Sequence, residues 1–163
     1  MSSAKTKTLI LEILKWLLVA GVIYLISLQL TVNKESNASF QSVSDAVFQS
    51  FDMSEVQLAD NQMIKRLYKL DPSEYDDIVL YYPTTNMGAE ELMIVKLKSL
   101  SQQETVKAAM ESRIESQQSV FEGYAPEQYE MLGNGIVDVQ GNYLILIVTD
   151  DPTAVQQAFR KAL

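Results

Sequence analysis

The run from residue 9 to residue 30 constrains this chain most, because it is apolar almost throughout. As a helix that rises about 1.5 Å per residue, the run would be about 33 Å long, which matches a bilayer hydrocarbon core of about 30 Å. Everything after it is polar enough to form a soluble domain. We therefore predict a transmembrane helix over residues 9–31, in contact with the lipid bilayer.

Lysines around the apolar run predict its orientation. Lys5 and Lys7 precede it together with the amino terminus, whereas only Lys34 follows it closely. Positive charge favours the cytoplasmic side of a membrane helix. Residues 1–8 would then form a cytoplasmic tail, and the rest of the chain would lie outside a single-pass cell-membrane helix.

A cleaved signal peptide is the alternative to a retained anchor. Such a peptide has an apolar region of about 7–15 residues, followed closely by a small-residue cleavage site. The run in this chain is longer, and the nearest Ser-x-Ala triplet, at residues 36–38, lies well beyond its end. We therefore expect a retained helix, a polar linker over residues 32–38 and an extracytoplasmic domain over residues 39–163.

Composition narrows the chemistry of this domain. The chain has no cysteine and no histidine, so it lacks disulfides, thiolate nucleophiles, the usual proton shuttle and most zinc ligands. From residue 34 onward, ten basic residues stand against twenty acidic ones, which disfavours binding to nucleic acid. No phosphate-binding glycine loop or calcium loop is present, so we expect no cofactor and no metal.

Periodicity and capping residues predict an α+β domain. Helical spacing of apolar residues follows the capping residues Ser39, Asp60 and Asp151 and a capping box at residues 101–104, and a short helical turn covers residues 127–132. Strands are predicted over residues 75–82, 91–97, 136–139 and 143–148. Short connections favour antiparallel pairing. We expect a roughly four-stranded antiparallel sheet with helices mainly on one face.

The second half of the chain carries a set of motifs that occur together in one family. These are an acidic start to the strand at residues 90–96, a helix with Arg113, Gln117 and Phe121, then Tyr124-x-Pro126, and a Gly-Asn-Tyr strand from residue 141. The set resembles an uncharacterised domain of Gram-positive anaerobes, found on lipoproteins and on single-span membrane proteins. The resemblance implies an extracytoplasmic domain without known catalysis, loosely associated with modification of envelope polysaccharides.

Four residues in this region are candidates for ligand binding: Arg113, Gln117, Phe121 and Tyr124. They would line a groove between the long helix and the loop after it, where the guanidinium group can bind a carboxylate or a sugar. The alternative is structural. In that case Arg113 extends over the edge of the core while Phe121 and Tyr124 pack.

Adjacent acidic residues do not predict catalysis. Asp76-Asp77 and Glu90-Glu91 lie in or beside strands, where neighbouring side chains point to opposite faces. Asp150-Asp151 precedes Pro152 and is explained by helix capping. We therefore expect no enzyme.

Two classes of function remain open. The first is a non-catalytic interaction module of the bacterial cell envelope that contacts another envelope protein. The second is a domain that binds a small ligand or a polysaccharide, or a weak carboxylate hydrolase. The first would show an exposed apolar or aromatic patch, and the second would show a concave pocket that holds Arg113 or two carboxylates.

Overall fold

The computed structural model describes residue 12, residues 14–24 and residues 35–163 of the chain. The chain divides into two compact units, one on each side of the boundary between Lys34 and Glu35. In the first unit, residues 14–24 form a helix.

The predicted transmembrane helix over residues 9–31 is wrong for the part of the chain that the structure describes. No helix there is both long enough and apolar enough to cross a membrane. The other residues of that predicted helix and the predicted tail, residues 1–8, lie outside the described residues.

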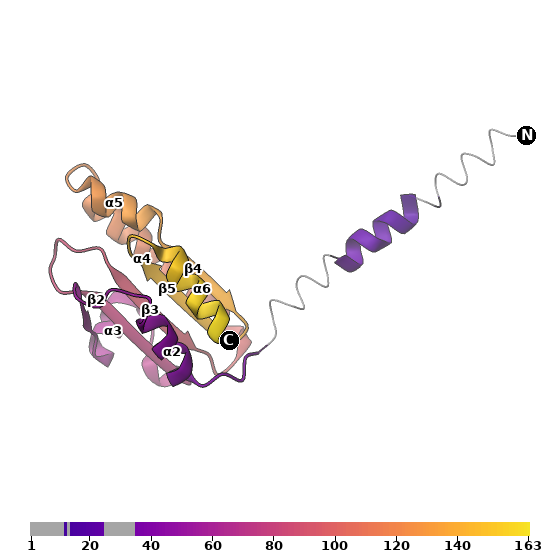
Figure 1. Ribbon diagram of the computed structural model, residues 1–163, viewed down its shortest axis with the longest axis horizontal. Helices are drawn as coiled ribbons and strands as arrows, with labels where there is room; N and C mark the ends of the chain where they lie inside the picture. The colour runs from indigo at the N-terminus through magenta and orange to yellow at the C-terminus, as the bar shows by residue number, and fades with distance from the viewer. Residues whose placement is uncertain (1–11, 13, 25–34) are drawn as a thin grey trace, which may run out of the picture. The chain divides into compact units, whose positions relative to one another are not determined.

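A five-stranded antiparallel sheet forms the central layer of the second unit (Figure 1). Its strand order is β1-β2-β3-β5-β4, so β2, β3 and β5 have neighbours on both sides. The strands are β1 (Val56–Leu58), β2 (Asp77–Pro83), β3 (Glu91–Lys96), β4 (Ile136–Gln140) and β5 (Tyr143–Val148). The sequence predicts the last four of these strands and misses β1.

Five helices surround the sheet, and two short 3₁₀ turns precede β2 and α4. The helices are α2 (Phe40–Phe48), α3 (Asn61–Tyr68), α4 (Gln103–Phe121), α5 (Pro126–Gly133) and α6 (Pro152–Ala162), and the turns are η1 (Pro72–Glu74) and η2 (Leu100–Gln102). Ser39, Asp60 and Asp151 cap α2, α3 and α6 through their side chains, as predicted. The capping box near α4 uses Ser99 and Gln102, two residues before the predicted position.

Helices cover both faces of the sheet, so the prediction of helices mainly on one face is wrong. In Figure 1, α2 and α6 lie side by side on one face. Their apolar residues pack with Leu92, Ile94 and Ile145 in one hydrophobic cluster. Residues of α3, α4 and α5 pack with Met93 and Leu146 in a second cluster. Because β5 is buried along its whole length, it requires cover on both faces.

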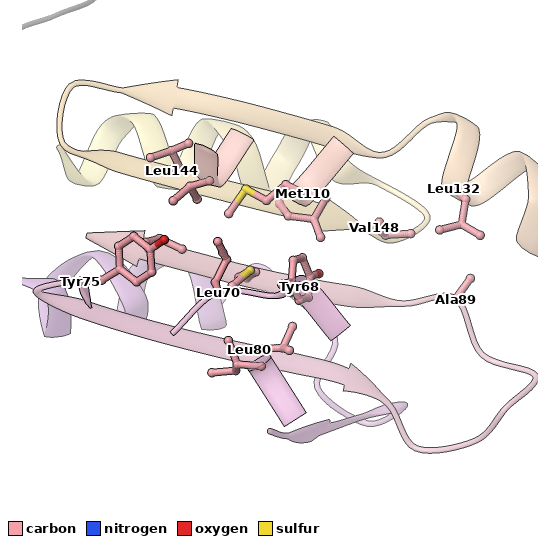
Figure 2. Packing of buried hydrophobic residues seen from close by; sticks show 14 of the residues in the cluster. Tyr68, Leu70, Tyr75, Leu80, Ala89, Met110, Leu132, Leu144 and Val148 are labelled. Atoms are coloured by element: carbon pink, nitrogen blue, oxygen red, sulfur yellow. The ribbon is translucent and has the colours of Figure 1, made fainter. Parts of the chain in front are cut away.

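The second cluster holds the helices that carry the candidate site. Figure 2 shows Tyr68 of α3 and Met110 of α4 directed toward Leu80 of β2 and Leu144 of β5. Leu132 of α5 lies toward one end of the same cluster. Each full burial of an aliphatic or aromatic side chain contributes about 1.5–3 kcal/mol, so this packing fixes where α3 and α4 lie on the sheet.

Candidate ligand-binding groove

A groove of about 330 Å³ lies between α3, α4 and the loop that joins β2 to β3. We call it the α3–α4 groove. Its apolar wall consists of Met63, Leu67, Tyr82, Pro83, Val120 and Phe121, and its polar groups come from Arg66, Thr85, Asn86, Arg113 and Gln117. Gly88 completes the lining.

Helical spacing brings the groove residues of each helix together. Arg113, Gln117 and Phe121 are four residues apart along α4, so they lie on the same edge of that helix. Met63 and Leu67 stand in the same relation on α3, and Arg66 adjoins them. The two edges face each other because both helices pack on the same side of the sheet.

A buried ion pair fixes Arg113 at the base of the groove. Arg113 Nε lies 3.0 Å from Glu91 Oε1, and Arg113 Nη2 lies 2.8 Å from Glu91 Oε2. The Arg113 side chain is 12% exposed and the Glu91 side chain 3%. The Tyr68 hydroxyl donates a hydrogen bond to the same carboxylate. Glu91 therefore holds the guanidinium group from one edge, and this restricts the rotamers that Arg113 can adopt.

Burial and charge act on the titratable groups of this cluster. Burial, and then the negative charge of Glu91, raise the pKa of the Tyr68 hydroxyl well above its usual value. Burial alone would lower the pKa of Arg113, but the hydrogen bonds and charge of Glu91 outweigh it, so that pKa is raised. Tyr68 is therefore neutral and Arg113 is charged across the physiological pH range.

Close backbone packing shapes the loop side of the groove. A Cβ atom added to Gly88 would lie 2.9 Å from the Cβ of Pro83, closer than two carbons can pack. The Gly88 N–H donates to the carbonyl of Thr85 at 3.3 Å, which closes the turn. Any other residue at position 88 would push this loop away from β2 and change the width of the groove.

The groove and a neighbouring hollow differ in charge. Two arginines and no carboxylate line the groove. A second hollow of about 470 Å³, near α5 and the end of β5, is lined by Glu90, Glu127, Glu130 and Asp150 and by no basic residue. Within the described residues, no group of three or more acidic side chains is arranged to hold a metal ion.

Three of the four residues proposed from the sequence meet in this groove, and one does not. The groove lies between α3, α4 and the β2–β3 loop, not between α4 and the loop after it, where the sequence placed it. Arg113, Gln117 and Phe121 line it, and Phe121 also belongs to the core with 1% of its surface exposed. Tyr124 lies outside the lining and is 56% exposed, with its ring tilted against that of Phe121 at 5.8 Å between centroids. Arg113 therefore lies at the edge of the core and also lines a groove, and ligand binding there stays a prediction.

Sequence reasoning missed the groove residues of α3 and of the β2–β3 loop. Lys65, Arg66 and Lys69 form a basic cluster near the end of α3, a pattern typical of a solvated helix end. Lys65 fits that interpretation, because it pairs with Asp71 at 2.7 Å outside the groove. Arg66 does not, because it lines the groove. The basic cluster was the signal in the sequence that could have pointed to the groove. The sequence alone does not tell which of its three residues lines the groove.

Comparison with known proteins gives one match. A family model described as a domain of unknown function, DUF4358, matches residues 49–149. The matched stretch contains all five strands, the helices α3, α4 and α5, and every residue that lines the groove. No curated protein and no solved structure matches the chain. The resemblance to an uncharacterised domain is thereby confirmed at the level of the family.

Proposed function

The chain belongs to the DUF4358 family, and from this premise we propose that its domain is a non-catalytic binding module that holds a ligand in the α3–α4 groove. The observation that carries the proposal is the meeting of Arg66, Asn86, Arg113 and Gln117 over an apolar wall in one concave site. These residues come from two helices and a loop that are distant in the sequence.

The size and lining of the groove favour a small ligand or a short chain segment. Binding sites for small molecules are clefts of about 300–1,000 Å³, mainly apolar, with a few polar groups that fix orientation. The α3–α4 groove, at about 330 Å³, lies at the lower end of this range. A flat contact with a large protein face would need no such hollow.

Arg113 and the two helices of the site are held in place by contacts that need no ligand. Glu91 and Tyr68 fix Arg113 from below, and α3 and α4 are anchored in the core by Ile64 and Met110. A site whose side chains are already ordered loses less conformational entropy on binding. This arrangement supports selective binding to a small site.

The polar groups of the groove favour binding over turnover. They are guanidinium, amide and hydroxyl groups, with no carboxylate among them, and the chain has no histidine. General acid–base catalysis near neutral pH needs a group that titrates in that range. This composition supports the non-catalytic reading of the site.

We also propose an envelope protein or an envelope polysaccharide as the source of the ligand, and a location outside the cytoplasm. The support is the resemblance to a domain of Gram-positive anaerobes that its members carry outside the membrane. Fractionation of the native cells with an antibody against the chain tests the location. Recovery of the chain with cytoplasmic markers would contradict it.

Amide NMR of the full chain with a library of small soluble fragments tests the binding function. We expect the fragments that bind to shift the signals of Gln117 and Val120. The variant Gln117→Trp should fill the groove and abolish the shift of the Val120 signal. Ser116→Trp is the matched control, because residue 116 is exposed on the same helix and does not line the groove.

The proposal fails if no fragment shifts the groove signals, or if both tryptophan variants bind equally well. Replacement of Arg113 by alanine is a poor test, because it also removes the partner of the buried Glu91. Breaking one side of a buried ion pair costs about 3–5 kcal/mol, so a loss of binding would be confounded with a loss of stability.

A further inference from the structure

We infer that the α3–α4 groove selects a ligand with a single carboxylate group and a short apolar chain, held between the guanidinium groups of Arg66 and Arg113. This inference rests on the proposed binding function and names the class of ligand. The apolar chain of the ligand would lie against Leu67 and Phe121.

Arg113 keeps donors for a second anion while it holds Glu91. The Glu91 carboxylate takes the edge formed by Nε and Nη2, and it does not use Nη1. A guanidinium group has five N–H donors in a planar fork and can bind a carboxylate along each of two edges. The side chain is 12% exposed and lines the groove, and the ligand would take Nη1 there.

Arg66 supplies the second cation. In the described part of the chain, no carboxylate lies within ion-pair distance of its guanidinium group. Its recorded side-chain contact is Nη2 to Met63 Sδ at 2.9 Å, and sulfur is a weak acceptor. Arg66 is exposed, so water solvates its guanidinium group until an anion in the groove replaces that water with a charge-assisted hydrogen bond.

The side chains that line the groove, taken together with the carboxylate that Arg113 holds, carry one net positive charge. Arg66 and Arg113 contribute two, and the Glu91 carboxylate beneath Arg113 removes one. One carboxylate therefore balances the site, whereas a dianion would leave an excess of negative charge in a chain whose net charge is already −8. The neighbouring hollow, with its four acidic side chains, would repel the same ligand.

NMR titration of the full chain with matched probes tests this inference. Hexanoate and N-acetyl-leucine present a carboxylate as a free fatty acid and as a peptide terminus, respectively. Hexanamide and N-acetyl-leucinamide are their neutral counterparts. We expect each acid to shift the Gln117 and Val120 signals with a dissociation constant about tenfold or more below that of its amide, and the stronger acid identifies the source of the carboxylate.

Three variants test which positive charges bind the carboxylate of the ligand. Arg66→Gln should weaken binding of the preferred acid about tenfold and leave binding of its amide unchanged. Arg113→Lys keeps a positive charge beside Glu91 but loses the planar fork, and should also weaken acid binding. Lys161→Gln removes the same unit of charge from an exposed position of α6 and should change nothing. Thermal melting of each variant shows that it is folded.

The outcomes separate the two proposals. If the amides bind as tightly as the acids, or if Arg66→Gln has no effect, the carboxylate inference is overturned while the groove remains a binding site. The same conclusion follows if neither acid shifts the groove signals but other fragments do. If no fragment of any kind shifts them, the binding function itself fails.

Discussion

Ser44 shows at the scale of one residue how costly an unpaired polar atom can be. It lies on α2 with 4% of its surface exposed, and among the buried side-chain oxygens and nitrogens that the structure describes, its hydroxyl lacks a hydrogen-bond partner. An unsatisfied buried hydroxyl costs about 1–3 kcal/mol. We expect Ser44→Ala to leave the free energy of unfolding unchanged or to raise it by up to about 2 kcal/mol, as measured by urea denaturation.

Ser39 provides the matched control on the same helix. Its side chain accepts a hydrogen bond from the Ser42 N–H at 3.1 Å and caps the amino end of α2. Ser39→Ala should lower the free energy of unfolding by about 1 kcal/mol. Equal destabilisation by the two alanine variants would contradict the assignment of Ser44 as unsatisfied.

Asp138 is the other buried acid of the sheet besides Glu91, and it lies on the opposite face. Its carboxylate accepts from Arg160 Nε at 2.6 Å, from Gln156 Nε2 at 3.0 Å and from Gln140 Nε2 at 2.9 Å. Burial alone would raise the pKa of Asp138, but these hydrogen bonds and the charge of Arg160 outweigh it and lower that pKa. The contact joins β4 to α6.

This lowered pKa predicts a stability that depends on pH. The folded state favours the charged carboxylate, so its contribution is fully present above the unfolded pKa of about 3.9. It is lost as the pH falls through the lower folded pKa. We expect Asp138→Asn to be less stable than the parent chain at pH 7, with a difference that shrinks in denaturation experiments below about pH 4. A constant difference across that range would contradict the lowered pKa.

At the scale of one element, α3 ends at a residue whose backbone conformation is unfavourable for a side chain other than glycine. Lys69, which follows the helix, has φ 60° and ψ 18°, a left-handed conformation that glycine adopts more readily than other residues. We expect Lys69→Gly to raise the free energy of unfolding by up to about 1 kcal/mol in urea denaturation, because the gain in native backbone conformation exceeds the loss of the Lys69 contact with the Arg66 carbonyl.

Gly141 provides the control, because there a glycine in the left-handed region is replaced by a residue with a side chain. It has φ 58° in the turn between β4 and β5, so Gly141→Ala should destabilise the chain by about 1 kcal/mol. If Lys69→Gly lowers stability as much as Gly141→Ala does, the strain assigned to Lys69 is wrong.

The sequence predicts the helices and strands whose patterns lie within one short stretch of residues. Capping residues such as Ser39 and Asp151 act within one turn, and the continuous apolar run of residues 143–148 lies within one strand, so both are visible in a single stretch of sequence. β1 has three residues, of which Val56 is buried and Leu58 is 62% exposed. Its extended form depends on pairing with β2, a contact about 25 residues away that no local pattern encodes.

The same division applies to the candidate site. Arg113, Gln117 and Phe121 are found from helical spacing alone, because they share one edge of α4. Arg66 and Asn86 join them only when α3 and the β2–β3 loop pack against α4, which is a tertiary arrangement. The sequence places Glu91 on a strand, as the structure does. The sequence does not distinguish Glu91, which is buried against Arg113, from its acidic neighbour Glu90.

At the scale of the whole molecule, the two hydrophobic clusters make the centre of the sheet the most stable part. β3 and β5 are paired on both sides and covered on both faces, whereas β1 is a short edge strand. Hydrogen exchange of the full chain should therefore show the slowest amides in β3 and β5 and much faster exchange in β1. Equal protection of β1 and β5 would contradict a core centred on β3 and β5.

The strand order has a consequence for synthesis of the chain. β5 fills the position between β3 and β4, yet it is the last strand in the sequence. Until the ribosome has delivered residues 143–148, one side of β3 has no strand to pair with and its amides and carbonyls stay open. The missing strand, Tyr-Leu-Ile-Leu-Ile-Val, carries no charge and no proline, a composition that associates readily with other exposed strands. A partly synthesised chain therefore exposes the unpaired side of β3, and prompt arrival of residues 143–148 covers that side before other chains can pair with it.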